Sequence, residues 1–110
     1  MEKAVAFFQR AEQVADTDNF DYAIDLYLEG LRLSPDALEA GHAPLRKLSL
    51  IRQGKGGKRP SIMDRMTRKG GKTALDEMLN AEYLLAKDPD NLSYAESMLK
   101  AAVSGEFRRT

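Results

Sequence analysis

The segment from Asp18 to Pro35 restricts the fold more than any other part of the chain. Within it, Ala23, Tyr27 and Gly30 recur at the spacing of one helix face. Pro35 follows where the apolar periodicity ends. Small residues let a neighbouring helix approach closely, and an aromatic ring fills the space beside them. The segment therefore predicts a helix that packs against another helix.

The preceding residues carry the same periodicity. Residues 3–15 place apolar side chains at intervals of three and four, which predicts an amphipathic helix. The polar run from Asp16 to Asn19 competes with helical backbone hydrogen bonds and predicts a turn. A second helix is expected over 21–33, so the two helices form an antiparallel hairpin.

This hairpin resembles the tetratricopeptide repeat (TPR) family, clearest over residues 4–37. Its second helix matches the A-x3-F…P half of the repeat, and its first helix matches the spacing of the W-x2-L-G-x2-Y half. The residues that carry the resemblance are Phe7, Arg10, Ala11, Val14, Ala23, Tyr27 and Pro35. The resemblance implies an all-α fold of antiparallel helical hairpins in a TPR-like right-handed array, with an interaction scaffold as the function class.

A third helix is expected after Ser34 and Pro35, which suit the N-cap and the first helical position. Its expected range is 37–53. We predict a kink near Gly41 to Pro44, because a proline inside a helix costs about 3 kcal/mol unless the helix bends.

The spacing of two prolines indicates an insertion. Pro35 and Pro89 close similar segments, yet their separation exceeds the 34-residue repeat by about 20 residues. The excess is the length of a glycine-rich basic segment, and helices are expected after it over 73–87 and 92–104. We therefore expect a single domain, 1–110, made of a first repeat at 4–35, a second repeat at 36–89 interrupted by a basic insertion at 53–72, and a half repeat or capping helix at 90–110.

The net charge of zero conceals a division along the chain. Residues 1–45 carry three basic and nine acidic side chains, whereas residues 46–72 carry ten basic and one acidic. This basic segment either folds back on its acidic flanks, stays solvated, or attracts nucleic acid or an acidic partner. It contains no aromatic residue, so stacking of bases is not supported. The basic patch comprises Arg52, Lys55, Lys58, Arg59, Arg65, Arg68, Lys69 and Lys72.

A short helix is expected inside the insertion. Ser61 and Asp64 form a capping-box variant that opens a helix to about Lys69. Ile62 and Met66 are the expected apolar anchors of this helix.

Catalytic chemistry has little support. The chain has no cysteine, which excludes disulfides, thiolate zinc sites and cysteine nucleophiles. His42 is the only histidine, so no second one shares a metal, and we expect it in a groove or on the surface. Gly70 to Thr73 resemble a phosphate-binding loop, but the first glycine of that motif falls at Met66. We expect no catalytic residue, no metal site and no cofactor.

The compartment is predicted from what the sequence lacks. The apolar run near the N-terminus is too short for a signal-peptide core, and no segment approaches about 18 consecutive apolar residues. Together with the absence of cysteine, this predicts a cytoplasmic protein.

The TPR resemblance also implies a partner groove lined by the first helix of each repeat. Carried over by position, its residues are Val5, Phe8, Glu12, Ala15, Asp16, Glu39, His42 and Arg46. Phe8 is either an exposed anchor for an apolar peptide or a core residue. We expect a non-enzymatic scaffold that binds a peptide or partner protein. The alternative is a nucleic-acid-associating helical domain that acts through residues 46–72.

Overall fold

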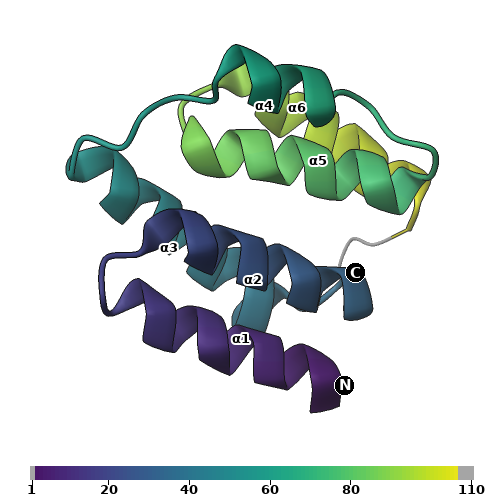
Figure 1. Cartoon of the computed structure of the whole chain (residues 1–110). Helices are drawn as coiled ribbons and strands as arrows, with labels where there is room; N and C mark the ends of the chain where they lie inside the picture. The colour runs from purple at the N-terminus through teal and green to yellow at the C-terminus, as the bar shows by residue number, and fades with distance from the viewer. Residues whose placement is uncertain (1, 107–110) are drawn as a thin grey trace.

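The computed structural model describes residues 2–106, and all regular structure in this range is helical (Figure 1). The elements are α1 (Glu2–Ala15), α2 (Phe20–Leu33), the π-helical segment η1 (Leu38–His42), α3 (Ala43–Gly54), α4 (Ile62–Thr67), α5 (Ala74–Lys87) and α6 (Leu92–Ser104). The expected all-α class is confirmed for the described residues. The unit predicted at 90–110 extends beyond them, because residues 107–110 lie outside the described range.

Two helical pairs form the body of the molecule. α1 packs along α2, and α5 packs along α6, while α2 and α3 both contact α5 and so join the two pairs. Figure 1 shows α1 at one end of the molecule and α4 at the other. None of the described helices is long and apolar enough to cross a membrane.

The core of the first pair forms around Phe8, which is 5% exposed. Its ring stacks on Tyr27, with 6.3 Å between the ring centroids. A Cβ atom added at Gly30 would overlap the Phe8 ring, and one added at Gly41 would overlap the side chain of Leu31. The two glycines therefore let α2 and η1 approach this ring closely, and Phe8 is a core residue.

Polar side chains fix α3 on the end of α5. Three residues at intervals of three on α3 donate hydrogen bonds to backbone carbonyl oxygens: Arg46 to Pro89 (2.8 Å), Ser49 to Ala86 (2.7 Å) and Arg52 to Lys87 (3.4 Å). The last carbonyls of a helix lack partners within it, and cations are favoured at its negative end. Ser49 and Arg52 supply donors to the last carbonyls of α5, Arg46 bonds the turn that follows, and together they hold α3 against α5.

The third helix begins later than predicted. Ser34 is not its N-cap but ends α2, where its N–H donates to the Gly30 carbonyl at 2.9 Å. The distortion expected near Gly41 to Pro44 takes the form of the π-helical segment η1. There the N–H of His42 bonds the carbonyl of Ala37, five residues back, at 3.0 Å. Pro44 follows directly and has no N–H to continue a regular ladder.

We predict that Gly30→Ala lowers the free energy of unfolding by about 1 kcal/mol, measured by urea denaturation. Overpacking against Phe8 lowers the free energy of unfolding by about 1–3 kcal/mol. The higher helix propensity of alanine raises it by about 1 kcal/mol. Gly54→Ala is the matched control, because a Cβ there meets no atom within 4 Å. Equal stability changes in the two variants would contradict the close-approach role of Gly30.

Candidate functional site

A groove with a volume of about 680 Å³ lies between α1 and the wall formed by η1 and α3. Its apolar lining includes Val5 and Phe8 from α1 and Pro44, Leu48 and Ile51 from α3. Ile51 is 44% exposed, so the apolar surface reaches the solvent. The groove thus offers an open apolar surface between elements distant in sequence.

The charged part of the lining is mainly acidic. Glu12 and Asp16 contribute carboxylates from α1 and the turn after it, and Glu39 contributes one from η1. Lys47 of α3 is the one basic residue of this lining. The electrostatic field in the groove therefore favours a basic ligand.

The structure brings six of the eight predicted groove residues together. Val5, Phe8, Glu12, Ala15, Asp16 and Glu39 all line this groove. His42 and Arg46 instead line a second cavity of about 320 Å³, between η1–α3 and α5–α6. The predicted set is therefore divided between two places, because the π-helical turn directs His42 toward α5.

His42 is held between two hydrogen-bond acceptors. Its Nδ1 lies 2.7 Å from Oε2 of Glu82, and its Nε2 lies 2.6 Å from the carbonyl oxygen of Pro35. A carbonyl oxygen only accepts, so Nε2 carries a proton, and a second proton lies between Nδ1 and the carboxylate. Burial by itself lowers the pKa of His42. The hydrogen bond and charge of Glu82 raise it, as do the Pro35 carbonyl and the Asp36 carboxylate. The raising effects are larger, so the pKa of His42 lies above its ordinary value.

The buried pair of His42 and Glu82 makes the free energy of unfolding depend on pH. Because the folded-state pKa of His42 is raised above 6.5, its contribution is complete below about pH 6.5 and is lost as the pH rises through the raised value. We predict that the urea midpoint of the wild-type protein falls from about pH 6.5 upward. Glu82→Gln keeps the shape of the side chain and should remove most of this decline. An equal decline in both proteins would show that the pair is not its source.

Part of the basic segment pairs with the protein's own acidic residues. Arg52, only 6% exposed, bonds Asp21 at 2.9 Å, so it does not belong to an exposed basic patch. Lys55 pairs with Asp18 at 2.9 Å. The remaining contacts of the predicted patch are Arg59 with Asp88 at 3.9 Å and Arg68 over the ring of Tyr83 at 4.0 Å.

The other four residues of the predicted patch are exposed. Within residues 2–106, no ion pair forms at Lys58, Arg65, Lys69 or Lys72.

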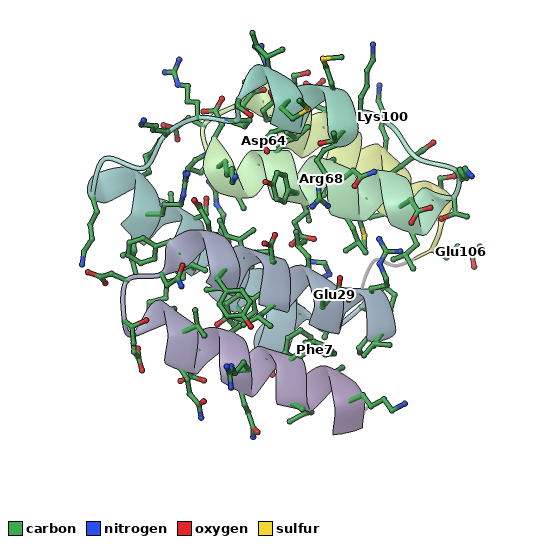
Figure 2. The ribbon with its side chains drawn as sticks, viewed as in Figure 1. Phe7, Glu29, Asp64, Arg68, Lys100 and Glu106 are labelled. Carbon is green, nitrogen blue, oxygen red and sulfur yellow. The ribbon has the colours of Figure 1, made fainter. Side chains whose placement is uncertain are left out.

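The helix α4 is anchored by polar contacts with α5. Asp64 accepts hydrogen bonds from the hydroxyl of Tyr83 at 3.0 Å and from Nζ of Lys87 at 3.3 Å. Asp64 and Arg68, labelled in Figure 2, both serve this contact, since the Arg68 guanidinium lies over the Tyr83 ring. Partial burial would raise the pKa of Asp64, but hydrogen bonds from the Ser61 N–H, Tyr83 and Lys87 lower it.

The expected apolar anchors of α4 were wrong. The capping box between Ser61 and Asp64 forms as predicted. Ile62 and Met66, however, are 69% and 71% exposed. In a helix of six residues the capping carboxylate and the apolar side chains point in different directions, and the polar network with Tyr83 determines which side faces α5.

We predict that Asp64→Ala raises the rate of trypsin cleavage after Arg65 and Lys69 about 5–30-fold. The variant loses its contacts to Tyr83 and Lys87, worth about 1–2 kcal/mol, and cleavage follows the population of the opened segment. Ile62→Ala is the control, which should cleave at the wild-type rate because that side chain is exposed. If only Ile62→Ala were cleaved faster than the wild type, the result would contradict the polar anchor and support Ile62 as the anchor of α4.

Two of these residues, Glu82 and Tyr83, were missed in the sequence. A usable signal existed, because Glu82 is the single charged residue between Met78 and Ala86. A lone carboxylate within an apolar run of a helix requires a buried partner. The spacing of Tyr83 and Lys87 by four residues likewise places them on one helix face.

Comparison with models of known protein families, with curated proteins and with solved structures gives no match to this chain. Over residues 2–106, histidine and carboxylate side chains form no group of three or more that could hold a metal ion. The candidate site is therefore defined by the geometry of the groove and its charges.

Proposed function

We propose that the protein is a non-enzymatic interaction module that holds a basic, partly apolar peptide segment of a partner protein in the groove between α1 and η1–α3. One observation carries this proposal: among the described residues, the groove combines an apolar lining with three acidic residues and one lysine. Apolar side chains of a peptide supply burial, and its lysine or arginine side chains complement the acidic lining.

The arrangement of the helices supports a TPR-like assignment. α1 and η1–α3 are the helices that the family resemblance places along the groove, and they line it from two sides. α3 and α5 pack together although residues 55–73 separate them, as expected of a second repeat split by an insertion. We therefore propose repeats at 4–35 and 36–89, with an insertion at 53–72.

The state of His42 supports a non-enzymatic role. Both ring nitrogens face acceptors at hydrogen-bonding distance, so neither is free to take a proton from a substrate. The sequence has no cysteine to act as a nucleophile. A cytoplasmic location, also proposed, agrees with the lack of cysteine.

Nucleic-acid binding through 46–72 has less support. Arg46 and Arg52 bond carbonyl groups at the end of α5, and Lys55 and Arg59 pair with carboxylates. These four side chains are engaged within the protein, which reduces the charge available to phosphates.

The test is fluorescence anisotropy with a short labelled peptide of leucine and lysine. We expect Ala40→Trp to weaken binding about tenfold or more, corresponding to at least about 1.4 kcal/mol, because Ala40 lines the groove and tryptophan fills it. Replacing Glu12 by Gln and Asp16 by Asn together should weaken binding and reduce its salt dependence.

The matched control is Glu96→Lys, a charge change at an exposed position of α6 outside the groove. It should bind the peptide as the wild type does, and thermal melting of each variant verifies that the fold is retained. Wild-type affinity in Ala40→Trp would refute the proposed groove.

A further inference from the structure

The inserted helix α4 presents its apolar side to solvent. Ile62, Met63 and Met66 are 69%, 68% and 71% exposed, while Asp64 and Arg68 on the other side contact Tyr83. At about 100° per residue, the three apolar side chains share one arc of the helix. Neighbouring exposed apolar side chains of this kind are a candidate interaction surface.

Basic side chains border this apolar arc on one side. Arg65 lies next to Ile62 on the helical wheel, Lys69 follows the end of the helix, and both line a groove of about 610 Å³ between α4 and α5–α6. Lys100 of α6 also lines this groove, and among the residues that the structure describes Glu77 is the one carboxylate there. We name Ile62, Met63, Met66, Arg65, Lys69 and Lys100 the α4 surface.

The acidic residue of α4 does not neutralise this charge. Asp64 accepts hydrogen bonds from Tyr83 and Lys87 on the side toward α5. Within residues 2–106, Arg65 and Lys69 form no ion pair. Hydroxyl groups from Ser93, Ser97 and Ser104 of α6 also line the groove and add hydrogen-bond donors.

We propose that the α4 surface binds an acidic amphipathic segment of a partner protein. Apolar side chains of that segment would cover the isoleucine and the two methionines, and its carboxylates would face Arg65, Lys69 and Lys100. This is a second surface, distinct from the groove at α1 and opposite to it in charge.

The observations favour a protein over a membrane or a nucleic acid. Methionine side chains adapt to varied apolar partner surfaces. Helices that bind bilayer surfaces are usually longer and carry Trp, Phe or Leu, whereas α4 has six residues and no aromatic one. Phosphates would match the cations but would leave the apolar arc uncovered.

The test uses the full chain and a labelled amphipathic peptide of leucine and glutamate. Binding by anisotropy should weaken about tenfold or more in the double variant Ile62→Ser/Met66→Ser and in Arg65→Glu/Lys69→Glu. Leu92→Ser is the matched control, since Leu92 is 75% exposed on α6 and does not line the groove. The control should retain wild-type affinity.

A crossed measurement separates this inference from the proposed function. Ala40→Trp should leave the acidic peptide bound, and the α4 variants should leave the basic peptide bound. Failure of the wild type to bind the acidic peptide, or equal affinity in the α4 variants, overturns the inference. Tighter binding to phosphatidylserine vesicles or single-stranded DNA that the same variants abolish would also overturn it, because the occupant would then be a lipid or a nucleic acid.

Discussion

The ring of Phe8, together with the side chain of Leu31, occupies the space that the missing side chains of Gly30 and Gly41 leave between α1, α2 and η1. Because a packed interior tolerates little change in volume, this contact sets how closely η1 approaches α1. The groove between α1 and η1–α3 takes its width from that approach. The direction of His42 also depends on it, since η1 carries Gly41 and His42 as neighbours.

The second half of the molecule depends on polar contacts. Ser49 bonds a carbonyl of α5, and His42 holds Glu82 of the same helix. Contacts of this kind are directional and leave costly unpaired groups when they are broken. The apolar core packs the two helical pairs against each other, and the polar contacts fix the register in which α3 packs against α5.

Two local signals in the sequence were confirmed, although the N-cap expected at Ser34 was wrong. The capping box at Ser61 and the distortion before Pro44 follow from backbone chemistry within a few residues. The predicted faces of α4 were wrong because a contact with Tyr83, distant in sequence, outweighs its apolar side chains. Arg52 was assigned to an exposed patch because its partners on α2 and α5 are equally remote.

The π-helical segment η1 has a consequence for the register of α3. A π turn holds one residue more than a regular turn, so it acts as a single-residue insertion within a helix. Deleting one residue from Leu38–His42 would close this wide turn into a regular one, and the later side chains would keep their directions because the turn itself accommodates the extra residue. Arg46, Ser49 and Arg52 would then still face the carbonyls at and just after the end of α5. The wide turn thus places Glu39 and Ala40 beside the groove at α1 and His42 beside α5, so that one turn of the chain serves two neighbours.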